Sequence, residues 1–171
     1  MPKDLLIHTV GHSDHTTETF VDLLRQYGIT LVVDVRSQPY SRWTPQFNRE
    51  TLARDLQDAG IVYQFMGDAL GGRPTDSALY DPGQEHADYQ RVEQTSAYQA
   101  GIDRLLELAQ TGRVAMMCSE GDHHHCHRHL LITQTLLGRT VRVLHVQPDG
   151  RTVEGELVPQ QLSLFGREEK P

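Results

Sequence analysis

Short apolar runs of strand length recur along this chain, and amphipathic stretches of helical length separate them. In one such stretch, Phe20, Leu23, Leu24 and Tyr27 follow the i, i+3, i+4, i+7 spacing of a single helical face. We expect strands at residues 5–10, 29–35, 61–66, 114–118 and 141–146, and helices at about 17–27, 49–59, 88–110 and 122–137. Strands that alternate with helices are joined by right-handed crossovers in a mainly parallel sheet. The pattern therefore predicts a single three-layer α/β domain, Rossmann-like in character, with about five strands and helices on both faces.

One domain accounts for most of the chain. A length of 171 residues suits one compact domain with a sizeable core. We expect residues 1–150 to form the α/β domain and residues 151–171 to form a C-terminal tail, with a weak strand pattern near residues 152–158. Residues 67–87 are irregular, and a loop of that length in a compact domain is often functional.

The composition is that of a soluble globular protein, with 37% hydrophobic and 23% charged residues. The longest apolar runs hold about six residues, whereas a membrane-spanning helix needs roughly 20. We expect no membrane segment and no signal peptide, and hence a cytoplasmic protein with both cysteines reduced. The net charge of -7 argues against non-specific DNA binding by the whole surface, but it is compatible with a local basic site.

Polar side chains follow three of the expected strands at the point where each strand ends. His12–Ser13 follows the first strand, Asp34 and Arg36 end the second, and Cys118 and Glu120 end the fourth. Ligands of open α/β sheets bind beyond the carboxyl ends of the strands. The sequence therefore predicts that these side chains share one cleft.

Four of these residues have the chemistry of catalytic groups. Cys118 precedes an expected helix start, where backbone N–H groups and the helix dipole stabilise a thiolate. His12, Asp34 and Glu120 are candidates for general acid–base work. The phosphatase pattern is not met, because the sixth residue after Cys118 is His124 rather than arginine. A purely structural interpretation stays open, with Cys118 packed in the core and the others serving as hydrogen-bonded anchors.

Arginines near the same strand ends predict an anion site for phosphate or carboxylate, if they converge. Arg42 lies in the loop after the second strand, and the competing interpretation is a structural ion pair between Asp34 and Arg36. The expected substrate-binding residues are Ser13, Arg36, Ser41, Arg73, Cys126, His127 and Arg128.

Metal binding is a further interpretation of the same region. Cys118, Cys126 and His127 offer ligands suited to zinc or another divalent transition metal. The spacing fits no standard structural zinc module, and the row His123–His125 is also typical of a solvated helix start. A divalent metal therefore stands as an alternative cofactor.

Four motifs occur in a fixed order: GHSDHTTETFVDLL, VVDVRSQPYSRWTPQFN, the turn Leu70–Arg73, and MMCSEGDHHHCHRHLL. Together they resemble the bacterial and archaeal family called domain of unknown function 488, over roughly residues 5–147. The resemblance implies a small α/β domain with the motifs in one cleft, and the family name gives no reaction. The histidine run is richer here than in the usual pattern, so His123–His125 are poor candidates for shared chemistry. The motif positions are Gly11, His12, Ser13, Asp34, Arg36, Pro39, Ser41, Phe47, Gly71, Gly72, Arg73, Cys118, Glu120, Cys126, His127 and Arg128.

The tail holds a second resemblance. The pentapeptide Gln161-Leu162-Ser163-Leu164-Phe165 is similar to the segment by which many bacterial replication and repair proteins bind the DNA polymerase sliding clamp. A glutamine that fills a small pocket and two apolar anchors in an extended tail suit such docking. The resemblance implies a role in DNA repair, with access to DNA through the clamp. The alternative is that Leu162, Leu164 and Phe165 pack back on the domain.

Three functions remain open at this point. The first is an enzyme that acts on nucleic acid or a nucleotide-like anion and is recruited to DNA by the clamp. The second is a metal- or redox-sensing Cys/His module without turnover. The third is a small-molecule enzyme that handles sulfur or phosphoryl groups through Cys118.

Overall fold

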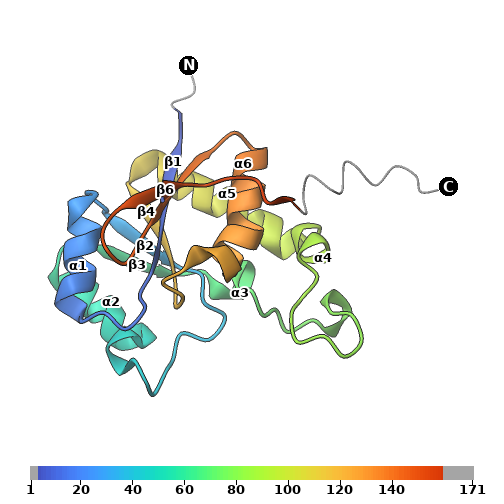
Figure 1. Cartoon of the computed structure of the whole chain (residues 1–171), viewed down its shortest axis with the longest axis horizontal. Helices are drawn as coiled ribbons and strands as arrows, with labels where there is room; N and C mark the ends of the chain where they lie inside the picture. Colours follow the sequence, from blue (N-terminus) through green and yellow to red (C-terminus); the bar gives the residue numbers. More distant parts are fainter. Residues whose placement is uncertain (1–3, 160–171) are drawn as a thin grey trace.

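The computed structural model describes residues 4–159, which form one mixed sheet with helices packed against it (Figure 1). The strands are β1 (Leu6–Gly11), β2 (Leu31–Asp34), β3 (Val62–Phe65), β4 (Val114–Cys118), β5 (Arg142–Val146) and β6 (Thr152–Glu154). Their order in the sheet is β3-β2-β4-β1-β5-β6. All neighbouring pairs are parallel except β5 and β6, which are antiparallel.

The two faces of the sheet bury separate apolar clusters, because successive strand residues point to opposite sides. Val32 and Met117 face one cluster, and their neighbours Val33 and Met116 face the other. The helices α1 (Thr17–Gln26) and α2 (Arg49–Asp58) complete the first cluster, and α5 (Ser96–Thr111) and α6 (Gln134–Gly138) complete the second. Figure 1 shows the same arrangement, with α1 and α2 on one side of the strands and α5 and α6 on the other.

The structure confirms a mainly parallel α/β sheet and corrects several details. The sheet has six strands rather than about five, because the weak pattern after residue 151 forms β6. The helix expected at 88–110 is two helices, α4 (Tyr89–Glu93) and α5, since the Thr95 hydroxyl caps the second one by accepting from the Tyr98 amide at 3.3 Å. The irregular stretch 67–87 contains the short helix α3 (Gly67–Leu70).

The helix expected at 122–137 also begins later than predicted. His123–His125 forms a 3-10 turn, and a π-helical segment, Arg128–Thr133, leads into α6. Single-turn π geometry often marks functional sites. Cys126 therefore lies before this helix rather than on one of its faces.

The strand order brings the three polar strand ends together. β4 lies between β2 and β1, so the ends predicted to share a cleft belong to adjacent strands. The His12 amide donates to the Cys118 carbonyl at 2.9 Å, and the Val35 amide donates to the Met117 carbonyl at 3.0 Å.

Among the helices of residues 4–159, none is long and apolar enough to cross a membrane.

Gly11 allows the loop after β4 to cross the end of β1. A Cβ at this position would lie 1.6 Å from the Glu120 carbonyl oxygen, which is backbone and cannot step aside. Only glycine fits there.

We expect Gly11→Ala to lower the free energy of unfolding by at least about 1–3 kcal/mol, the usual cost of overpacking. Urea denaturation measures this loss. Gly138→Ala is the matched control, since an added Cβ there meets nothing within 4 Å. Equal stability of the two variants would contradict the close approach at Gly11.

Candidate functional site

A pocket of about 370 Å³ lies beyond the carboxyl ends of β2 and β4. Six of the residues predicted to form the site line it: Arg36, Arg73, Cys118, Glu120, Cys126 and His127. The remaining lining residues are Ser37, Gln38, Tyr40, Gly72, His86, Tyr89, Ser119 and His125. Two arginines, two thiols, a carboxylate and an imidazole thus meet in one cavity.

Arg36 is held rigidly on one side of the pocket. Its Nε and Nη2 donate to the two oxygens of Asp34 at 2.9 and 2.8 Å, and Nη2 also donates to the Phe47 carbonyl at 2.8 Å. Asp34 is fully buried and accepts a further bond from the Tyr63 hydroxyl at 2.5 Å. The carboxylate of Asp34 is therefore occupied as the support of Arg36, and its geometry is that of a positioning group.

His12 lies behind Arg36, outside the residues that line the pocket. Its Nδ1 donates to the Ser13 carbonyl at 2.8 Å, and its Nε2 is 3.3 Å from Nη1 of Arg36. Burial lowers the pKa of His12 to about 4, so the ring is neutral near pH 7 and its Nε2 accepts from the guanidinium. These contacts take up four of the five guanidinium N–H groups of Arg36 and leave one N–H of Nη1 to meet a ligand.

The turn Leu70–Arg73 packs closely against Ser37 and His127 because its glycines lack side chains. A Cβ on Gly71 would lie 2.2 Å from the Ser37 hydroxyl, and one on Gly72 would lie 2.8 Å from the His127 ring. The Arg73 amide then donates to Ser37 Oγ at 2.9 Å. This contact brings the exposed Arg73 side chain to the pocket that Arg36 also lines.

The two cysteines form a buried pair. Their sulfur atoms are 2.8 Å apart, and both thiols are free. Cys118 also lies 3.7 Å from the Glu120 carbonyl, and Cys126 lies 3.8 Å from Nδ1 of His127. Nε2 of His127 is 2.8 Å from the Val35 carbonyl, which fixes the imidazole beside the Cys126 sulfur.

The pKa values of the two thiols shift in opposite directions. Donation from Cys118, together with a contact to His127, lowers the pKa of Cys126 to about 4 against the effect of burial. Burial and the same bond raise the pKa of Cys118. The structure thus points to Cys126 as the thiolate and to Cys118 as its hydrogen-bond donor, whereas the sequence favoured Cys118.

Arg128 lies behind the pocket rather than on its wall. It is fully buried and donates to the Thr9 hydroxyl at 2.6 Å and to the carbonyls of Glu120 and Gly121 at 2.9 and 3.1 Å. Among the residues the structure describes, no carboxylate forms an ion pair with it. Its charge therefore favours the nearby Cys126 thiolate, and its contacts brace the loop after β4.

The other predicted residues lie elsewhere. Ser13 and Ser41 do not line the pocket, and Ser41 Oγ instead accepts from the amides of Trp43 and Thr44 at 3.1 and 3.3 Å. Within residues 4–159, the ligand atoms of Cys118, Cys126 and His127 do not all lie close enough together to bind one metal ion. The tail pentapeptide, Gln161 to Phe165, lies outside the described residues.

Several residues of the site were not predicted. Tyr40 and Ser37 come from the loop after β2, His86 lies within the irregular stretch 67–87, and Tyr89 follows that stretch. The length of that stretch was the available signal. No local pattern indicated which of its side chains reach the pocket.

A model of the family described as Domain of unknown function DUF488 matches residues 16–134. The match covers most of the chain, including the strand ends of β2 and β4 and both cysteines. No curated protein and no solved structure matches the chain.

We expect the rate of Cys126 alkylation by iodoacetamide to be nearly constant from pH 6 to pH 8, because the thiolate already predominates. An ordinary thiol would react about tenfold faster per pH unit below its pKa. Mass spectrometry of the modified peptide measures the rate. Cys118→Ala removes the donor, so it should raise the pKa of Cys126 and restore the pH dependence. A tenfold rise per unit in the unaltered protein would contradict the assigned thiolate.

Proposed function

The chain belongs to the family described as Domain of unknown function DUF488, and we propose that it is an enzyme acting on nucleic acid or a nucleotide-like anion in the Cys118–Cys126 pocket. The observation that carries this proposal is the meeting of a low-pKa thiol with two arginines in one cavity. Perturbed titratable groups in a cleft are typical of catalytic sites.

The roles follow from the contacts. Arg36 offers one free N–H from a fixed position, and Arg73 offers a guanidinium that lines the same pocket, so an anion in the pocket receives charge-assisted bonds from both arginines. The Cys126 thiolate is the nucleophile of the pocket, with Cys118 as the adjacent proton donor. Glu120 is the lining carboxylate suited to proton transfer. Asp34 and His12 act by holding Arg36 in place.

Exposed aromatic side chains in the loop after β2 support a nucleotide-like substrate. Trp43 is 80% exposed and Tyr40, which lines the pocket, is 55% exposed. The guanidinium carbon of Arg42 lies 4.7 Å from the Trp43 ring centre. Aromatic rings next to arginines are the usual platform on which unpaired bases stack.

Recruitment through the tail completes the proposal. With a net charge of -7, the surface as a whole repels DNA. The pentapeptide Gln161-Leu162-Ser163-Leu164-Phe165 supports docking on a sliding clamp that encircles DNA. Such docking raises the local concentration of the enzyme at its substrate without any basic surface.

One observation favours a second candidate, a redox-sensing module. The sulfur atoms of Cys118 and Cys126 are 2.8 Å apart, so a small movement brings them to the roughly 2.05 Å of a disulfide. A disulfide here would remove the thiolate and leave both arginines in place. Mass spectrometry after diamide treatment detects this bond, and retention of both free thiols would exclude the candidate.

We expect Trp43→Ala to weaken binding of a short single-stranded oligonucleotide by about 5- to 150-fold, the loss of one stacked base. Arg73→Ala should weaken binding by a similar factor for every oligonucleotide sequence. It should also lower the slope of log affinity against log salt concentration by about one. Fluorescence anisotropy measures both effects. Arg104→Ala is the matched control for charge, because Arg104 is exposed on α5 and does not line the pocket. Equal affinity in all four proteins would count against a nucleic-acid substrate.

For the tail, we expect the full chain to retain the sliding clamp in a pull-down and the double variant Leu164→Ala, Phe165→Ala to lose it, because both apolar anchors are removed. Ser163→Ala, at the position between the leucines, should bind as before. Absence of clamp binding by the unaltered protein would remove the support for recruitment to DNA.

A further inference from the structure

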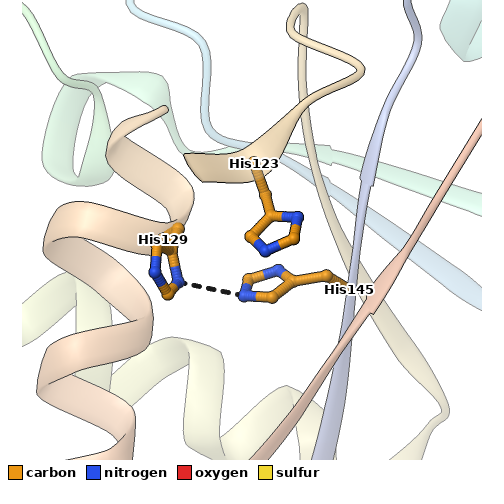
Figure 2. A group of neighbouring side chains, drawn as sticks. All are labelled: His123, His129 and His145. Carbon is orange, nitrogen blue, oxygen red and sulfur yellow. Dashed lines mark hydrogen bonds between the residues drawn. The ribbon is translucent and has the colours of Figure 1, made fainter. Parts of the chain in front are cut away.

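Three buried histidines that do not line the pocket lie close to one another (Figure 2). His123 comes from the 3-10 turn after β4, His129 from the π-helical segment, and His145 from β5. Their exposed fractions are 2%, 7% and 0%. Figure 2 shows the three rings gathered between the helix and the strand.

The nitrogens have the spacing of a metal site. One ligand nitrogen from each ring lies within 4.8 Å of the others, and Nδ1 of His129 is 3.1 Å from Nε2 of His145. Two nitrogens bound to one tetrahedral zinc are roughly 3.4 Å apart, given bonds of about 2.0–2.1 Å. The His123 ring stacks on His145 with centroids 4.0 Å apart, so binding requires that ring to turn toward the shared point.

The surroundings keep all three imidazoles neutral, the form that binds metals. Burial lowers the pKa of His123 to about 4 and that of His145 to about 2, and it also lowers the pKa of His129. The guanidinium of Arg128 adds to this effect. Asp122, Cys126 and Glu156 oppose it.

Outer contacts orient two of the rings. Thr9 Oγ1 lies 2.6 Å from Nδ1 of His145, where the hydroxyl oxygen accepts the Nδ1 proton. The Gln147 amide nitrogen lies 3.1 Å from Nδ1 of His123, and metal binding through Nε2 of His123 requires this amide to turn so that its oxygen accepts from Nδ1. Such contacts to the distal nitrogen set the tautomer and direction of metal-binding histidines. These hydrogen bonds give each imidazole a partner, but they do not require all three rings to bring a nitrogen within reach of one point.

We propose that His123, His129 and His145 bind a late first-row divalent transition metal, with zinc as the favoured ion and an open fourth position. Three histidines with a free position are a common zinc arrangement. The three ligand atoms are imidazole nitrogens, and this donor set disfavours hard ions such as Mg²⁺, which bind through oxygen ligands. The ion would tie the turn after β4 to β5 and thereby stiffen one wall of the pocket.

The experiment uses the full, untagged chain freed of metal by chelation and dialysed against zinc. We expect one equivalent of bound zinc and a higher Tm. Replacement of zinc by cobalt identifies the ligands through the visible absorption spectrum. If the three histidines bind the ion, the spectrum should show the bands of tetrahedral cobalt and no sulfur-to-cobalt charge-transfer band. Appearance of that band would place the metal on the cysteines and overturn the proposal, as would binding of less than about one-tenth equivalent.

Variants provide an independent readout. His129→Gln and His123→Gln should each weaken zinc binding by more than the roughly 10- to 100-fold that loss of an outer contact costs. His125→Gln is the matched control, because His125 is exposed in the same histidine run but lines the pocket instead. The double variant Cys118→Ser, Cys126→Ser should bind zinc unchanged. Equal loss in His125→Gln, or loss only in the cysteine variant, would overturn the assignment.

Discussion

The buried ion pair between Asp34 and Arg36 is the interaction on which the site depends. Its two side chains are 0% and 5% exposed and 2.8 Å apart. A buried pair stabilises a fold only if its remaining donors and acceptors are also satisfied, and loss of one partner typically costs about 3–5 kcal/mol. Here β3 supplies Tyr63, the loop before α2 supplies Phe47, and the end of β1 supplies His12. One charge pair therefore fixes three chain segments around the pocket, and it leaves the guanidinium aimed at whatever anion enters.

Sequence patterns located the strands to within a residue or two because apolar runs bounded by glycine and polar turns leave few alternatives. They could not supply the strand order, which depends on crossovers rather than on local composition. The break at Thr95 was missed because the apolar stripe continues on both sides of it, and the cap becomes visible only with its bond to Tyr98. Likewise, the sequence indicated a solvated helix start at His123–His125, whereas His123 is buried beside His129 of the π-helical segment and His145 of β5.

Contacts that local sequence does not reveal also explain why Cys126, rather than Cys118, is assigned as the thiolate. Cys118 was favoured because it ends a strand before an expected helix, which is sound local reasoning. The decisive facts are the 2.8 Å contact with Cys126 and the position of His127, and these depend on where the helix begins. Residues whose chemistry is set by a neighbour far away in the chain are the ones that sequence reasoning assigns least well. Arg128 is another, since it was expected in the pocket and instead braces the loop from behind.

The position of β4 between β1 and β2 has a consequence for the order of events during synthesis. β1 and β2 leave the ribosome early, yet neither contacts the other in the finished sheet. β1 and β2 each keep an unpaired edge until residues 114–118 emerge. Unpaired strand edges are the regions that aggregate most readily. The central strand arrives together with both cysteines and the arginine that braces them. The nascent chain therefore joins β1 to β2 and brings in both cysteines in the same late step, before β5 and β6 extend the sheet beyond β1.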